Sequence, residues 1–186
     1  MGRLKSFTLI ELIIVVGITS LMVPVVFSIV FVIIQQQTKI IRLQEVKRQG
    51  DFILSNIKTT IRNNAVEIYS NNDLTEEHKV CATSDSSYEG LSGQSLYFKD
   101  KLGKWFNYYL TDDKISSGSS LFISNPEELT NDQVAITNYT ITCTRQSIYS
   151  TPMIALSITL QYNTTSTRPE DTAELTYNTN IKLKSY

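Results

Sequence analysis

The chain has 186 residues, of which 41% are hydrophobic and 19% are charged, and this is enough for one packed domain plus an extension. Its formal net charge of −1 gives no overall attraction to nucleic acid or to any other charged partner. Two cysteines, Cys81 and Cys143, are too few for a disulfide-rich miniprotein. Apolar residues are concentrated before residue 35, whereas Ser, Thr, Asn and Tyr are abundant after it.

A short basic segment precedes a long apolar run. Residues 1–6 contain Arg3 and Lys5, and residues 7–34 contain a single charged residue, Glu11. As a helix, the apolar run would extend about 42 Å, which is more than the roughly 20 residues that a bilayer core requires. The basic start predicts a single pass through the cytoplasmic membrane, with the N-terminus inside and the remainder of the chain outside.

An ordinary secretory signal peptide would have a shorter apolar region followed by a small-residue cleavage site, and residues 35–39 offer no such site. A plain signal anchor fits the length of the run but does not explain Glu11. A charged side chain at the centre of a membrane helix costs about 2.5–3.5 kcal/mol, so such residues are functional by default. Glu11 is therefore expected either to reach the lipid headgroups or to meet a specific partner.

Residues 5–12, Lys-Ser-Phe-Thr-Leu-Ile-Glu-Leu, resemble the N-terminal signal of type IV prepilins and type II secretion pseudopilins. The resemblance covers about residues 3–34. It implies that a prepilin peptidase cleaves between Ser6 and Phe7, and that Phe7 becomes the N-methylated first residue. It also implies that Glu11 meets the N-terminal amine of a neighbouring subunit during assembly. The family usually has Gly before the cut, where this chain has Ser6, and this departure predicts slower processing.

Cleavage at this position would create an ammonium group about one helical turn from Glu11. Both charges lose water in an apolar filament core, so each needs an opposite partner, and their pairing would fix the register between subunits. Pro24 lies inside the same apolar run and removes one backbone donor, so a helix kink is expected there. Pilins and pseudopilins often carry a helix-breaking residue in this stretch. An ordinary tolerated proline in a membrane helix is the alternative.

Residues 35–69 show helical periodicity with one apolar face. The apolar positions follow steps of three and four residues: Leu43, Val46, Ile53, Ile57, Ile61, Ala65 and Ile68. One continuous helix is predicted from about Phe7 to about Tyr69, and the turn-forming residues Ser70–Asp73 are expected to end it. Packing of this face on the chain's own head is favoured over a coiled coil, because the spacing is imperfect for heptads.

Residues 70–186 are predicted to form a β-rich globular head. Ser95–Lys99 and Lys104–Leu110 flank a Gly-containing turn and are typical of a hairpin. Alternating apolar residues predict three further half-buried antiparallel strands, which contain Tyr139–Cys143, Ile154–Tyr162 and Ala173–Leu183. The expected fold is α+β, with a long N-terminal helix packed on an antiparallel sheet. The order of the later elements, from Leu129–Val134 onward, is similar to that of the larger minor pseudopilins.

Cys81 and Cys143 both lie outside the membrane in this topology, and they are expected to pair if that compartment is oxidising. Closing a loop of 62 positions (143 − 81) would stabilise the head by roughly 4 kcal/mol. Two separate buried thiols are the alternative, which geometry alone can decide.

No residue pattern indicates catalysis, a cofactor or a metal. The single histidine, His78, lies in a charged stretch without a second histidine at metal-ligand spacing. Adjacent acids at 76–77, 112–113, 127–128 and 170–171 are expected in solvated loops. Lys and Arg are scattered, so no nucleic-acid-binding stripe is indicated, although nucleic acid stays open as a partner. The chain is therefore expected not to be an enzyme.

The leading hypothesis is a minor type IV pilin or pseudopilin, a structural subunit of an extracytoplasmic filament. Its expected partners are prepilin peptidase, other pilin or pseudopilin subunits, the assembly platform and the membrane. The alternative is a membrane-anchored or filament-tip binding module, such as an adhesin or a DNA-uptake subunit, because exposed loops rich in Tyr, Ser and Asn suit contacts. Pilus assembly, type II secretion and DNA uptake share the N-terminal signal, so all three machines remain open.

Overall fold

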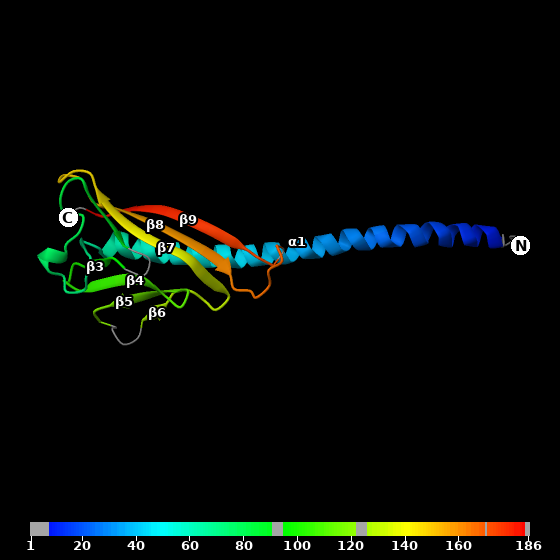
Figure 1. The fold of residues 1–186 in the computed structure, drawn as a ribbon, viewed down its shortest axis with the longest axis horizontal. Coiled ribbons are helices and arrows are strands. Elements are labelled where there is room, and N and C mark those ends of the chain that lie inside the picture. Colours follow the sequence, from blue (N-terminus) through cyan, green and yellow to red (C-terminus); the bar gives the residue numbers. More distant parts are fainter. Residues whose placement is uncertain (1–7, 91–94, 122–125, 170, 185–186) are drawn as a thin grey trace, which may run out of the picture.

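The computed structural model describes residues 8–90, 95–121, 126–169 and 171–184. A helix of 56 residues, α1 (Leu9–Asn64), comes first, and the remaining elements are short. In chain order these are β1 (Glu67–Tyr69), the 3-10 helix η1 (Glu76–His78), β2 (Ser86–Gly90), β3 (Tyr97–Lys99), β4 (Trp105–Thr111), β5 (Lys114–Ser119), β6 (Glu127–Glu128), β7 (Val134–Arg145), β8 (Met153–Tyr162) and β9 (Glu174–Lys182). Figure 1 shows that α1 runs through the β-rich head and projects from one end of it.

Helix α1 continues through Pro24 without a break in the helical assignment, and the kink expected at Pro24 stays a prediction. The helix ends at Asn64, so the predicted end near Tyr69 is wrong. Ala65 is already extended, with φ −70° and ψ 128°. The next residues pair with β3, and Ile68 lies opposite Phe98. The sheet therefore takes over the backbone hydrogen bonds that a longer helix would have made.

The strands form two antiparallel sheets. The first has the order β1-β3-β4-β5-β6 and the second has the order β2-β7-β8-β9. The predicted hairpin is confirmed as β3 and β4, with Lys99 opposite Trp105. Asp100 shapes its turn, because one carboxylate oxygen accepts hydrogen bonds from the backbone N–H groups of Leu102 and Lys104, both at 2.8 Å. Gly103 has φ +76°, a left-handed conformation that glycine adopts without strain.

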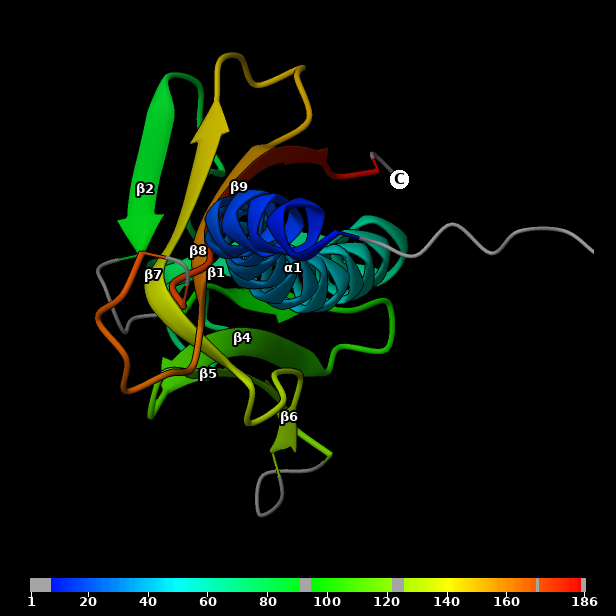
Figure 2. The ribbon, with the colours of Figure 1, turned by 90° about the vertical axis from the view of Figure 1, so that its right-hand side faces the viewer.

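The predicted α+β fold, with a long helix on antiparallel strands, is confirmed, but the head contains two sheets where one was expected. Figure 2 shows α1 lying between them, with β8 and β9 on one side and β4 and β5 on the other. The fully buried face of α1 packs chiefly against β8 and β9. The buried residues on this face are Val46, Gly50, Ile53, Ile57 and Ile61.

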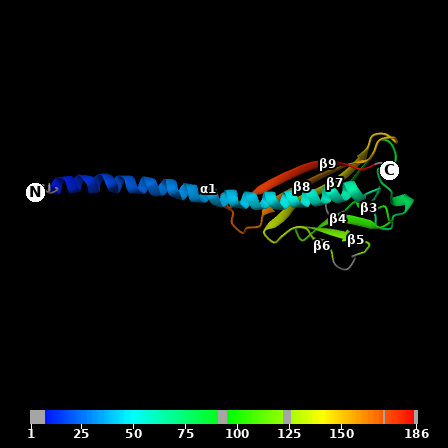
Figure 3. The same ribbon diagram turned by 180° about the vertical axis from the view of Figure 1, so that it is seen from behind.

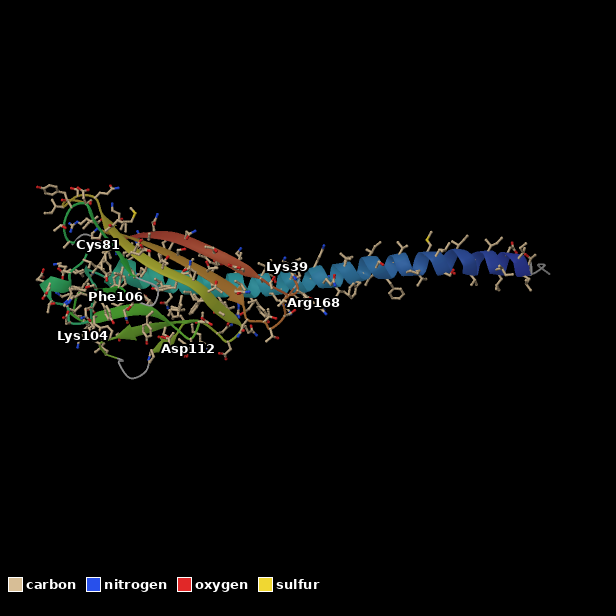
Figure 4. The ribbon with its side chains drawn as sticks, viewed as in Figure 1. Lys39, Cys81, Lys104, Phe106, Asp112 and Arg168 are labelled. Carbon is tan, nitrogen blue, oxygen red and sulfur yellow. A yellow bond between two sulfur atoms is a disulfide. The ribbon has the colours of Figure 1, made fainter. Side chains whose placement is uncertain are left out.

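The head has two ends that differ in their relation to the helix. We call the end at which α1 terminates the distal end, and the end from which α1 projects the proximal end. Figure 3, seen from behind, shows α1 in front of the strands along most of the head, with the short helix η1 lying beyond its end. In Figure 4, Lys39 and Arg168 lie together at the proximal end, whereas Cys81 and Lys104 lie toward the distal end.

Candidate functional site

The projecting half of α1 is bare. Each described residue from Thr8 to Ile34 is exposed, although this stretch holds large apolar side chains such as Leu21, Phe27 and Phe31. Within the described part of the chain, this is the one helix long and apolar enough to cross a membrane. Exposed apolar surface of this extent marks contact with lipid or with other protein.

Glu11 closes a capping box at the start of this helix. Thr8 is the N-cap, and its side-chain oxygen accepts from the backbone N–H of Glu11 at 3.4 Å. The Glu11 carboxylate folds back and accepts from the backbone N–H and the hydroxyl of Thr8, both at 3.0 Å. The carboxylate therefore lies at the positive end of the helix dipole and satisfies donors that the first turn leaves free. The predicted cleavage and methylation residues, Ser6 and Phe7, lie outside the described residues.

Arg42 links the helix to the proximal end of the head. Its guanidinium forms an ion pair with the Asp171 carboxylate at 2.6 Å and donates to the Asp171 backbone carbonyl at 2.6 Å. It also lies 5.2 Å from the centre of the Tyr162 ring. A hydrogen bond from Ser166, with the charge of Arg42 nearby, lowers the pKa of Asp171 from its ordinary value. The connection between β8 and β9 is thereby fastened to the helix at the proximal end.

Close packing continues two turns farther along the helix, at Gly50. A Cβ atom at this position would overlap the ring of Tyr177 from β9. The Tyr177 hydroxyl donates to the backbone carbonyl of Lys47 at 3.2 Å. The absence of a side chain at residue 50 therefore allows β9 to lie directly on the helix.

A partly buried charge cluster follows the end of α1. The Glu67 carboxylate accepts from Lys79 at 2.5 Å, from Lys99 at 3.0 Å and from the Tyr69 hydroxyl at 2.9 Å. The hydrogen bond from Lys79 lowers the pKa of Glu67 to about 2, with Lys99 and Tyr69 acting in the same direction and partial burial opposing them. Its hydrogen bond to Glu67 likewise raises the pKa of Lys79. This cluster joins β1, β3 and the segment after η1.

The two cysteines pair, as expected. The Cys81–Cys143 disulfide joins Cα atoms that are 6.3 Å apart and ties the segment before β2 to the C-terminal part of β7. Arg145, two residues farther along β7, donates to backbone carbonyls on both sides of this link. Its acceptors are Ala82, Ser147, Ile148 and Ser150, at 2.6–3.2 Å.

These contacts hold the β7–β8 loop, whose tip residue Tyr149 is 97% exposed. A distal cleft of about 430 Å³ lies beside this loop, and Glu67, Lys79, Arg145 and Tyr149 are among its lining residues. The cleft contains both cationic and anionic groups, so its charge does not indicate one class of ligand.

The described residues contain no group of three or more His, Cys, Asp and Glu side chains that could hold a metal ion. His78 pairs locally, with its Nδ1 atom 3.0 Å from Asp73 and 2.9 Å from the Thr75 hydroxyl. Of the adjacent acids expected in loops, Glu127 and Glu128 instead form the short strand β6. That expectation is wrong for this pair, because the two residues complete the edge of the first sheet beside β5.

Comparison with known proteins adds no relative, because no protein-family model, curated protein or solved structure matches the chain. The residues predicted from the sequence lie in two different parts of the structure. Glu11 and Pro24 lie on the bare half of α1, whereas Cys81 and Cys143 lie in the head. Arg42, Glu67 and Arg145 were not singled out from the sequence, because no local motif marks them. Arg42 and Glu67 meet partners that are distant in the chain, whereas Arg145 joins the distant Ala82 to carbonyls of its own loop.

Proposed function

We propose that the chain is a type IV pilin or pseudopilin, a structural subunit of an extracytoplasmic filament. One observation carries the proposal. A single uninterrupted helix has a first half that is apolar and fully exposed, and a second half that is docked in a disulfide-linked head. Lipid covers the apolar surface of such a helix before assembly, and neighbouring helices cover it afterwards. The resemblance of residues 5–12 to the prepilin signal supports the same proposal.

In this proposal the N-terminus lies in the cytoplasm, and the head lies outside the cytoplasmic membrane until the assembly platform transfers the subunit to the filament. Prepilin peptidase cuts between Ser6 and Phe7. Glu11 then has two roles: it caps its own helix through Thr8, and its charge pairs with the Phe7 ammonium of a neighbouring subunit. Pairing in the dry filament core offsets the desolvation of both groups.

A binding module at the filament tip is the second candidate function. It is favoured by the distal cleft and by the β7–β8 loop, which Arg145 holds through four backbone carbonyl acceptors while Tyr149 is exposed. Exposed aromatic side chains on a fixed loop suit recognition of a partner surface. This function keeps the same membrane topology and adds a ligand at the distal end.

The first experiment is intact-mass measurement of the membrane form, with and without active prepilin peptidase. The expected result is a chain that begins at N-methylated Phe7 only when the peptidase is present. A chain that keeps Met1–Ser6 in both conditions would contradict the pilin pathway and leave a plain signal anchor.

The same preparation separates the two roles of Glu11. Glu11→Gln keeps a side-chain acceptor at the third position of the capping box but removes the charge, whereas Thr8→Ala removes the cap and keeps the charge. We expect Glu11→Ala and Glu11→Gln each to lower co-fractionation with other pilins about tenfold, the equivalent of about 1.4 kcal/mol. Thr8→Ala should leave it within about fivefold of the parent, because an N-cap contributes about 1 kcal/mol. Normal incorporation of Glu11→Gln would reduce Glu11 to a capping residue.

A further inference from the structure

A cluster of unpaired positive charge lies where the last turns of α1 meet the end of β9. Its four members are all exposed: Lys58, Arg62, Lys182 and Lys184. They line two adjoining hollows of about 390 and 360 Å³, whose remaining lining residues are uncharged. Within the part of the chain that the structure describes, none of the four forms an ion pair. We call this surface the basic groove, and its net charge is +4.

Negative charge gathers at a second surface, on the edge of the first sheet. Five exposed carboxylates belong to it: Asp112, Asp113, Glu127, Glu128 and Asp132. One lysine lies among them, since Lys114 pairs with Glu128 at 3.0 Å and with Asp132 at 2.6 Å. We call this surface the acidic edge, and its net charge with Lys114 is −4. Asp112, Asp113 and Glu127 have no ion pair within the described residues.

The two surfaces lie at different heights along the helix axis. Asn131, next to Asp132, donates to the Glu45 carboxylate at 2.9 Å, so the Asp132 end of the acidic edge lies level with Glu45. Glu127 lies farther toward the distal end, in register with Tyr108, whose hydroxyl donates to Asn56. The basic groove lies level with Lys58 and Arg62, which are 13 and 17 residues farther along α1. At about 1.5 Å per helical residue, the basic groove is roughly 20–25 Å from the Asp132 end of the acidic edge along the helix axis.

The surfaces also face in different directions. Figure 2, viewed along the helix, shows β9 and β6 on opposite sides of α1. The basic groove and the acidic edge of one chain therefore do not meet each other, but those of two chains can. A contact between two different surfaces of the same chain is heterologous, and repetition with a shift and a rotation generates an open helical array.

We propose that the basic groove of one subunit receives the acidic edge of a second copy of this chain, displaced by about 20–25 Å along the helix axis. Opposite charges of equal size favour this occupant over a nucleic acid, because a polyanion would neutralise the groove and leave the acidic edge unmatched. The inference rests on the proposed filament function, for which it names a contact between heads that is separate from Glu11.

Charge reversal on each surface tests the contact in the full-length chain in its membrane. Lys58→Glu, Arg62→Glu and Lys182→Glu together change the groove from +4 to −2. Glu127→Lys, Glu128→Lys and Asp132→Lys together change the edge from −4 to +2. Each triple variant brings like charges together, whereas the combination of both restores opposite charges. Asp112 and Asp113 are left unchanged, because both have positive φ, which lysine adopts less readily than aspartate.

The readout is disulfide cross-linking between Asn63→Cys in one copy and Gln133→Cys in another, because both positions are exposed and neither is charged or changed in the triple variants. Cys81 and Cys143 do not compete, because both are buried and already paired. The control pair is Asn63→Cys with Lys104→Cys, since both of these residues lie toward the distal end. We expect the test pair to give at least about ten times the dimer of the control pair, and less dimer at about 1 M salt, where the screening length is roughly 3 Å.

Each triple variant should lower the yield of the test pair about tenfold, and the combined variant should bring it back to within about threefold of the parent. Folding is checked by retention of the native disulfide on a non-reducing gel.

Equal yields from the test and control pairs would overturn the inference. The inference would also be overturned if the groove variant lowered the cross-link yield, the edge variant did not, and the combined variant did not restore it. That result would assign the groove to another partner, such as a polyanion. Correct processing at Phe7 without the cross-link would reject this contact alone, whereas a charge-dependent cross-link in an unprocessed chain would reject the filament proposal alone.

Discussion

Glu67 is the acceptor at the centre of a charge cluster that closes the distal end of the head. Its carboxylate is about one-quarter exposed and accepts from Lys79, Lys99 and Tyr69. These contacts hold the pKa of Glu67 at about 2, below its ordinary value of 4.5. Since the pKa is depressed in the folded chain, the contribution of Glu67 to stability is fully present above about pH 4.5. It is lost as the pH falls through about 2.

We predict that Glu67→Gln lowers the free energy of unfolding by about 1–3 kcal/mol at pH 7, because it removes the charge that Lys79 and Lys99 stabilise. The shift in the pKa of Glu67 sets the upper end of this range, and the partial exposure of its carboxylate, which weakens ion pairs, sets the lower end. The difference from the parent should shrink between pH 4.5 and pH 2, where the parent carboxylate becomes protonated. Urea unfolding of the full chain in detergent, followed by fluorescence of the single tryptophan, Trp105, measures this. Glu174→Gln is the matched control, because Glu174 is exposed on β9 without an ion pair in the described chain. A difference that stays constant with pH would show that Glu67 does not titrate as described.

Sequence reasoning found the residues whose chemistry is unusual for their surroundings and missed those that depend on distant partners. Glu11 stands out because it is the one charge in a long apolar run. The cysteines stand out because they are the only pair, and the structure confirms their pairing. Glu67 meets Lys79 and Lys99 across 12 and 32 positions of the chain. No local pattern records such a contact, because it exists only once the first sheet has formed.

At the scale of elements, the helix was easier to predict than the sheets. Periodicity located α1, the β3–β4 hairpin and the long strands β7, β8 and β9. It placed the helix end too late, because Ala65 and Ile68 continue the three- and four-residue steps although Ala65 is the C-cap of the helix and Ile68 pairs with β3. The division into two sheets was not predictable, since alternation shows which residues of a strand face the core but not which strand lies beside it.

Substitution of Gly50 tests how closely α1 packs on β9 of the second sheet. Alanine favours a helix over glycine by about 1 kcal/mol, yet its Cβ would overlap the Tyr177 ring. Displacing that ring also breaks the hydrogen bond from the Tyr177 hydroxyl to Lys47. Overpacking typically costs about 1–3 kcal/mol. We therefore predict that Gly50→Ala lowers the free energy of unfolding by about 1–2 kcal/mol in urea titrations.

A double-mutant cycle distinguishes this contact from an effect on the helix alone. In a Tyr177→Ala background the obstruction is gone, so Gly50→Ala should become neutral or stabilising by up to about 1 kcal/mol. The same destabilisation in both backgrounds would mean that Tyr177 is not what requires glycine at residue 50.

At the scale of the whole molecule, a bare helix about 40 Å long must be held at a defined direction relative to the head. The hydrophobic stripe begins fully buried only at Val46, so polar contacts fix the preceding turn. Arg42 provides them through Asp171 and Tyr162. A defined direction matters for any assembly in which the helix and the head each contact neighbours, because an error at the joint displaces one contact relative to the other.

We predict that Arg42→Gln loosens the proximal end of the head without unfolding it. Loss of the ion pair and of the contact with Tyr162 should raise amide hydrogen exchange in peptides covering the β8–β9 connection about fivefold to tenfold, the equivalent of about 1–1.4 kcal/mol. Exchange in β7 and β8, at the centre of the second sheet, should not change. The matched control is Arg48→Gln, since Arg48 is 70% exposed and pairs with Glu45 on its own helix. Equal exchange in the two variants would mean that the hydrophobic stripe alone fixes the direction of the helix and that Arg42 is dispensable for it.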